Sequence, residues 1–169
     1  KTMFDEAGVP YPEAGWTYDD MLEIAKKLTI PGEQYGVGIG ASNADPSNVF
    51  LTLSPVIWSY GGDYLNEDQT ECTLNTPEAI EAIRYWTGLY TTEKVAPVNY
   101  TMTKDIMPLF IENKVALMMG GDQNAVEFDT NYPDLNYGYC VPPKAPSGSG
   151  GWLFTVPVTA KNSPGAYKF

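Results

Sequence analysis

The sequence predicts an α/β fold in which helices flank a short central sheet. Two observations carry this prediction. Apolar residues recur at helical spacing in segments that open with capping residues, and short apolar runs of strand length stand between those segments. With 169 residues, 43% of them hydrophobic and 18% charged, the chain is long and apolar enough to bury a core as one domain.

Each expected helix has a start or a stop signal. Thr76, Pro77 and Glu78 open the clearest one with a cap, a proline at the first position and an acid in the first turn. Its expected apolar face is Ala79, Ile80, Ile83, Trp86 and Tyr90. The others are a first helix that ends at Gly8, a second capped by Thr17 that ends before Pro31, a third capped by Ser47 that ends at Gly61, one capped by Thr103, and a short one over residues 122–128.

Strands are expected over residues 35–39, 114–119, 137–141 and 152–158. Residues 63–65 and 72–74 flank a polar turn and predict a small hairpin. The acids at the tip of this hairpin lack the ligand series of a calcium loop. The alternation of strands with helices predicts the α/β class.

Charge and composition exclude several classes of function. The net charge of −11 disfavours nucleic acid as a partner. The absence of histidine excludes Ser-His-Asp and Cys-His catalysis and removes the commonest metal ligand, so no cofactor is expected. Cys72 and Cys140 are too far apart for a thioredoxin-like pair or a zinc knuckle. One disulfide and two separate buried thiols both remain open.

A series of short motifs occurs in one fixed order along the whole chain. It comprises MFDEAG at 3–8, WT at 16–17, GGDYLN at 61–66, NTPEA at 75–79, AP at 96–97, FIENKVALMM at 110–119, NYG at 136–138, GGW at 150–152 and KNS at 161–163. Each motif alone is weak, but the ordered series resembles the extracellular solute-binding proteins of bacterial ABC importers. Within them it resembles the carbohydrate-binding group that includes maltose-binding protein.

The resemblance implies one lobe of a type II periplasmic-binding-protein fold, in which two α/β lobes close over a ligand. It assigns residues 1–151 to the second, C-terminal lobe and 152–169 to the start of the return toward a first lobe that is missing here. It also implies non-catalytic binding of a sugar or oligosaccharide for delivery to the membrane subunits of an importer. The expected location is extracytoplasmic, either periplasmic or as a cell-surface lipoprotein whose signal segment is not in this sequence.

Three loops are expected at the carboxyl ends of strands, where open α/β sheets bind ligands. Trp152 is the first candidate, as a plate that stacks on a sugar ring, with the role of a core residue as its alternative. Asp122 is the candidate acceptor of sugar hydroxyls, and its alternative is the N-cap of the helix that follows. Trp58 would reach the cleft or, more simply, fill the core; Trp16 and Trp86 are assigned to packing. The remaining polar candidates are the amides of Gln123 and Asn43 and the carboxylate of Asp45, with solvated loop positions as their alternative. Gly121 and Gly151 are candidates because a glycine permits a ligand to approach the backbone closely.

One departure from the family and three rival functions remain. Where the family often has Gly-x-Trp after the apolar run, this sequence has Gly120, Gly121, Asp122 and Gln123, so the stacking ring usual at that loop is absent. The rivals are a glycosidase that works through paired carboxylates, a receptor for a non-sugar solute, and a structural or adhesive module.

Overall fold

The computed structural model describes residues 1–40, 46–98 and 103–143, together with Val156, Thr159, Lys161, Asn162 and Gly165. Within these ranges it has two strands and six helices. No helix among the described residues combines the length and the apolar character needed to cross a membrane.

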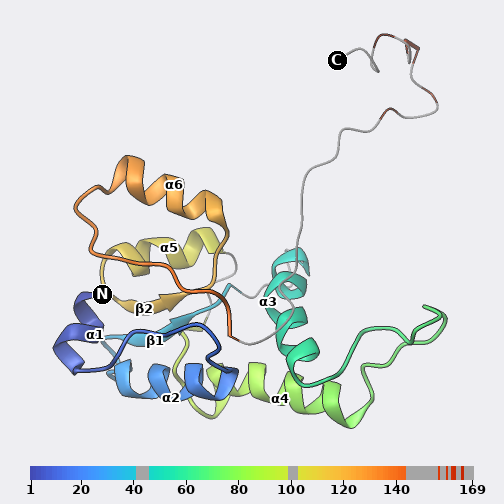
Figure 1. The fold of residues 1–169 in the computed structure, drawn as a ribbon, viewed down its shortest axis with the longest axis horizontal. Coiled ribbons are helices and arrows are strands. Elements are labelled where there is room, and N and C mark those ends of the chain that lie inside the picture. Colours follow the sequence, from blue (N-terminus) through green and yellow to red (C-terminus); the bar gives the residue numbers. More distant parts are fainter. Residues whose placement is uncertain are drawn as a thin grey trace.

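The sheet joins two segments that are distant in the sequence (Figure 1). Strand β1 (Tyr35–Gly38) pairs in parallel with β2 (Val115–Met118), with Tyr35 opposite Val115 and Val37 opposite Leu117. Helices α5 (Thr103–Ile111) and α6 (Asp122–Asn131) lie on one side of the sheet. Helix α2 (Tyr18–Leu28) lies on the other side, and α1 (Thr2–Ala7) lies beside it. The predicted α/β class and both of these strands are confirmed.

Two further helices extend the body beyond the end of β1. Helix α3 (Pro46–Ser59) packs against α4 (Pro77–Thr91), and the hairpin between them projects away from the sheet (Figure 1). The hairpin prediction is confirmed by an antiparallel bridge between Leu65 and Cys72. The Asn66 side chain stabilises its turn by accepting the backbone N–H of Thr70 at 2.8 Å.

The helix signals in the sequence correspond closely to the observed helix ends. Thr17 caps α2 by accepting the Asp20 N–H at 3.1 Å, while the Asp20 carboxylate accepts the Thr17 N–H at 2.8 Å. Thr76 caps α4 with Pro77 at its first position, and Gly8 ends α1 at φ 64°. Three boundaries were wrong by one or more residues. Helix α5 begins at Thr103 itself, which was predicted to be its cap. Helix α3 begins at Pro46 instead of after Ser47, and α6 continues to Asn131 instead of ending at Phe128.

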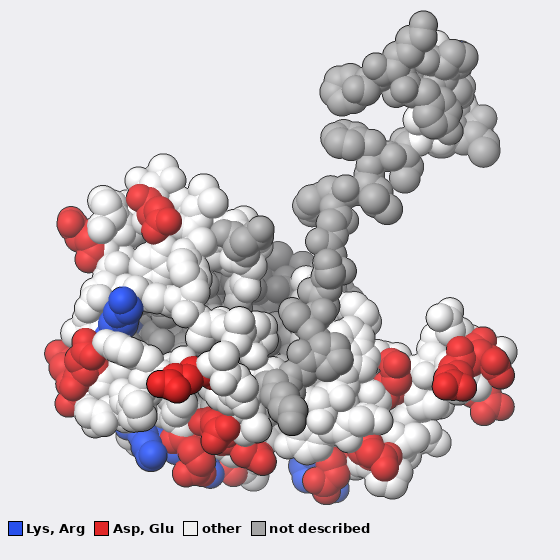
Figure 2. All heavy atoms as spheres, viewed as in Figure 1, with Lys and Arg blue, Asp and Glu red and all other residues white. Residues whose placement is uncertain are grey.

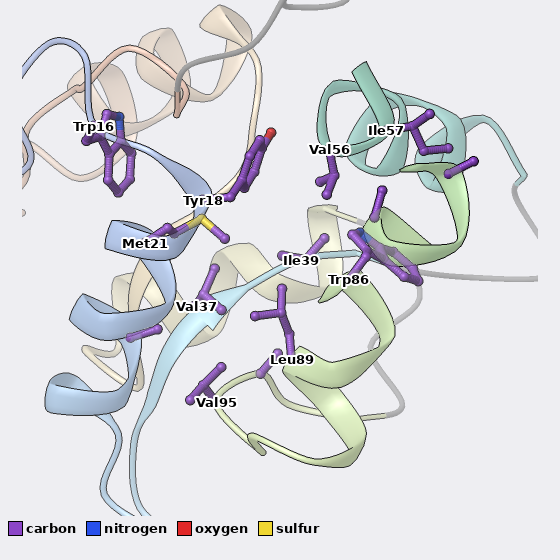
Figure 3. Packing of buried hydrophobic residues seen from close by; sticks show 14 residues of the cluster. Trp16, Tyr18, Met21, Val37, Ile39, Val56, Ile57, Trp86, Leu89 and Val95 are labelled. Atoms are coloured by element: carbon purple, nitrogen blue, oxygen red, sulfur yellow. The ribbon is translucent and has the colours of Figure 1, made fainter. Parts of the chain in front are cut away.

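The main core lies between α2, β1, α3 and α4 (Figure 3). The packing role predicted for Trp16 and Trp86 is confirmed, since both belong to this cluster and are less than a tenth exposed. The predicted face of α4 was wrong at Ile80, which is 43% exposed. The buried apolar side chains are Ala79, Ala82, Trp86 and Leu89, spaced by three, four and three residues, and this spacing directs Ile80 away from the core.

The strand predicted over residues 137–141 does not form. The Tyr137 N–H bonds locally to the Leu135 carbonyl at 3.0 Å instead of to a neighbouring strand. The segment is held by aromatic packing: Tyr137 lies 5.2 Å from Phe128 and 5.2 Å from Tyr139, between ring centres. Cys72 and Cys140 are both exposed free thiols, so neither of the two expectations for them, a disulfide or burial, is met. The strand predicted over 152–158 lies almost wholly outside the described residues.

Helix α2 and strand β1 touch through their backbones. A Cβ atom on Gly36 would lie 2.0 Å from the carbonyl oxygen of Ala25, closer than any real contact. Thr29 joins the two elements beside this point, since its hydroxyl donates to the Ala25 carbonyl at 2.7 Å and accepts the Gly36 N–H at 3.0 Å. The position of α2 along β1 is therefore fixed by the absence of a side chain at Gly36.

Substitution Gly36→Ala is expected to lower the free energy of unfolding by about 3 kcal/mol, because the backbone of α2 must move to admit the methyl group. Gly88→Ala is the matched control: its added Cβ would meet only the hydroxyl of Thr92, at 3.1 Å, and it should change stability by about 1 kcal/mol or less. Urea unfolding monitored by circular dichroism measures both. Equal effects of the two substitutions would contradict a rigid contact at Gly36.

Candidate functional site

The carboxyl edge of the sheet is the candidate site. Because β1 and β2 are parallel, the chain leaves both strands at this edge, after Gly38 and after Met118. Two glycines, Gly120 and Gly121, connect β2 to α6, so the first turn of α6 lies next to the end of β2 (Figure 1). Helix α3 stands across the same end of the sheet, with Val56 and Ile57 in the main core.

At the two glycines before α6, the side chains of Asn124 and Gln123 fold back over the turn and occupy the space that a Cβ atom would need. A Cβ on Gly120 would lie 2.5 Å from Asn124 Oδ1, and one on Gly121 would lie 2.3 Å from Gln123 Oε1. Gly121 is the N-cap of α6, and its backbone N–H donates to Asn124 Oδ1 at 3.0 Å. The backbone of this turn is thus held by Asn124 and presented without side chains of its own, as a ligand that contacts main-chain groups requires.

The structure brings three of the predicted site residues together. Gly121, Asp122 and Gln123 occupy the cap and first turn of α6, and Gln123 is exposed. The alternative role considered for Asp122 was wrong by one residue: Gly121 is the N-cap, and Asp122 is the first residue of the helix.

Trp58 lies apart from this group, in the last turn of α3 near the hairpin (Figure 1). It is half-buried, and its indole N–H donates to Asp63 Oδ1 at 3.2 Å. Since Asp63 also accepts the Tyr64 N–H at 2.7 Å, Trp58 has a structural partner at the base of the hairpin. Asn43, Asp45, Gly151 and Trp152 lie outside the described residues, and their roles stay predictions.

Asn124 is a residue of this site that the sequence analysis missed. Its side-chain oxygen accepts a hydrogen bond from the Gly121 backbone N–H, and its backbone N–H donates to the Gly121 carbonyl at 3.0 Å. The signal was available, because an amide three residues after a helix cap is the spacing of a capping box. Asn124 holds the turn that carries Gly121 and Gln123.

A hollow of about 410 Å³ lies elsewhere, at the opposite edge of the sheet. Asn113, just before β2, and Asn131, at the end of α6, are among the residues that line it. Among the described residues, no group of acids and cysteines is arranged to hold a metal ion. Gly120, Gly121 and Gln123 are not among the residues that line the hollow, so it is separate from the carboxyl edge.

Acidic side chains dominate the surface over α2, α4 and the hairpin (Figure 2). The chain has 21 acidic residues against 10 basic ones, and several of the basic residues are paired: Lys26 lies 3.0 Å from Glu93, Arg84 lies 3.3 Å from Glu81, and Lys114 lies 2.6 Å from Glu112. The resulting negative potential opposes anionic ligands.

Comparison with known proteins gives one family over the whole chain. The family described as bacterial extracellular solute-binding protein matches residues 1–169. A Brucella abortus protein (strain 2308) named as a binding protein is 30% identical over 153 residues, which are 89% of this chain and 36% of that protein. The chain thus spans about a third of the length of the curated relatives it matches.

Solved structures give the same result for the fold. An ABC substrate-binding protein from Listeria monocytogenes in complex with cycloalternan is 32% identical, with a TM-score of 0.64 over 78% of this chain and 32% of that one. An ABC transporter solute-binding protein from Thermotoga lettingae bound with α-D-tagatose is 27% identical, with a TM-score of 0.82 over 99% of this chain and 44% of that one. The predicted type II periplasmic-binding-protein fold is confirmed as a fragment by these superpositions.

Substitution Asn124→Ala is expected to lower the free energy of unfolding by about 1 kcal/mol, because Gly121 loses the acceptor of its N–H. Asn131→Ala is the control at the other end of α6, where an exposed amide donates to Glu127 Oε1 at 2.8 Å. It should cost less than about 0.5 kcal/mol. Chemical denaturation measures both, and an Asn124→Ala variant as stable as the wild type would contradict the capping role.

Proposed function

Since this chain belongs to the family of bacterial extracellular solute-binding proteins, as its ordered motifs indicated, we propose that it forms part of a receptor for a sugar or oligosaccharide. The receptor binds its ligand without chemical conversion and delivers it to the membrane subunits of an ABC importer. The observation that carries the proposal is the likeness, at 26–32% identity, to solved proteins bound to cycloalternan, tagatose and maltose.

The site geometry supports a neutral, hydroxyl-rich ligand. The exposed amide of Gln123 both donates and accepts hydrogen bonds, as sugar hydroxyls require, and the glycine turn beside it leaves main-chain groups open to contact. The acidic surface opposes phosphorylated or carboxylated solutes. These features favour a carbohydrate over an anionic solute.

The rest of the proposed receptor follows from the family. Residues 1–151 would form the second lobe, with 152–169 beginning the return to a first lobe, and the ligand would lie between the two. Binding would shift the lobes toward a closed form that the importer recognises. The family's description as extracellular supports a place outside the cytoplasm, in a periplasm or on the cell surface through a lipid anchor.

A thermal-shift screen of the full-length protein against mono- and oligosaccharides tests the proposal. A sugar present at a hundred times its Kd adds about 2.7 kcal/mol of stability and should raise the Tm measurably. The panel includes maltose, tagatose and cycloalternan. Recovery of the unaltered sugar by chromatography after incubation distinguishes a receptor from a glycosidase. A folded protein that no sugar stabilises would contradict carbohydrate binding.

Substitutions in the candidate loops test the site. Trp152→Ala and Gln123→Ala should each weaken binding of the best sugar, by about tenfold or more for Trp152, because a stacking ring is lost. Asn131→Ala, on the same helix as Gln123 but at its other end, should leave the Kd unchanged. Isothermal titration calorimetry measures the three values. Full affinity in Trp152→Ala would move that ring from the site into the core.

A further inference from the structure

Two buried polar atoms of the main core have no hydrogen-bond partner among the described residues. They are the hydroxyl of Tyr18, a residue that is 3% exposed, and the indole nitrogen of Trp86, which is 8% exposed. Two neighbouring, partly buried tyrosines do have partners: the Tyr90 hydroxyl donates to the Ile39 carbonyl at 2.8 Å, and the Tyr85 hydroxyl donates to the Tyr18 carbonyl. Because an unpaired buried hydroxyl is costly, folded proteins nearly always supply it with a partner.

The backbone contact at Gly36 gives the position of Tyr18. Helix α2 runs antiparallel to β1, with Ala25 directly over Gly36 (Figure 1). Tyr18 is seven residues before Ala25, which is about 10 Å along a helix. The same distance along a strand is about three residues and leads from Gly36 to Ile39. Tyr18 is therefore level with the carboxyl end of β1, at the edge described as the candidate site.

Figure 3 shows the direction of the hydroxyl. The Tyr18 ring points away from Met21 and Val37, so that its oxygen lies at the margin of the cluster. Trp86 belongs to the same end of β1, since its ring lies 5.5 Å from that of Tyr90, whose hydroxyl is bonded to Ile39. Both unpaired groups thus lie near the point where the chain leaves β1.

We infer that the Tyr18 hydroxyl is a ligand-recognition group, which exchanges a hydrogen bond with a hydroxyl of the bound carbohydrate. This inference rests on the proposed function. A phenol donates one hydrogen bond and accepts others, which matches a sugar hydroxyl. Burial raises the pKa of Tyr18 to about 12, so the group stays protonated at physiological pH. Since the oxygen is covered, the contact forms together with a local rearrangement on binding.

Substitution Tyr18→Phe in the full-length protein tests the inference, because it removes only the hydroxyl and keeps the ring that packs against Tyr85 at 5.8 Å. The sugar that binds the wild type best should bind the variant about fivefold to tenfold more weakly in calorimetry. The Tm without sugar should stay the same or rise, because an unpaired polar group is gone.

Tyr90→Phe is the matched control. Tyr90 is partly buried at the end of β1, but its hydroxyl is already bonded to the Ile39 carbonyl. This variant should have a lower Tm and an unchanged sugar Kd, the reverse of the effect of Tyr18→Phe. A set of singly deoxygenated sugars gives a second measurement: one of them should lose affinity for the wild type but not for Tyr18→Phe.

The outcomes separate the inference from the proposed function. If the wild type binds a sugar and Tyr18→Phe binds it within twofold, with no deoxy sugar that distinguishes the two proteins, Tyr18 is not a recognition group and its partner is a buried water. If the wild type binds no sugar of the panel, the proposed function itself fails, and the inference fails with it.

Discussion

The direct contact between the backbones of Gly36 and Ala25 sets the geometry on which the other elements depend. It places α2 against β1 with no side chain between them, and the Thr29 hydroxyl bridges the two. Because the two backbones lie so close at Gly36 and Ala25, α2 can cover β1 in one register only. That register places Trp16 where its indole N–H reaches the Val141 carbonyl at 2.7 Å, which ties the segment after α6 to the start of α2.

The same constraint explains why the carboxyl edge is available for binding. On one side β1 is paired with β2, and on the other the Val37 N–H donates to the Val95 carbonyl at 3.1 Å. The backbone of β1 is therefore hydrogen-bonded to neighbouring segments on both sides, and the connections at its carboxyl end are left to contact a ligand. The Gly120–Gly121 turn and the unpaired Tyr18 hydroxyl meet this edge from opposite sides of the sheet.

Local signals in the sequence predicted the elements well, because their causes are local. Thr17 and Thr76 cap helices through bonds to residues three positions later, and Gly8 ends a helix by its own conformation. The strand expected over 137–141 does not form because Tyr137 packs on Phe128 and Tyr139 packs on Tyr137, contacts that periodicity cannot distinguish from sheet pairing. The prediction that Ile80 is buried failed because, in sequence, an apolar residue beside the buried stripe of α4 cannot be told from one within it.

In the candidate site too, residues that act through local contacts were predicted, with Asn124 as the exception, and residues placed by distant contacts were not. The glycine turn and Gln123 were predicted from their place after an apolar run, which is a local pattern. Asn124 acts through the same turn and was overlooked, although its spacing from Gly121 was visible. Tyr18 was read only as part of a helix start, because its place at the edge follows from the contact of Ala25 with Gly36, and no sequence pattern reveals that contact. The sequence also did not reveal the hydrogen bond from the Trp58 indole to Asp63, because Asp63 belongs to the hairpin.

The pairing of β1 with β2 also bears on how the protein is made. Tyr35 lies opposite Val115, so the sheet joins positions that are 80 residues apart. Strand β1 therefore stays without its partner until residues 115–118, much later in the chain, can reach it. During that interval α2 can already cover one face of β1, while the hydrogen-bonding edge stays open to other extended chains. Contacts of such long range also slow folding. A folding chain of this protein is therefore most exposed to mispairing before β2 has docked on β1.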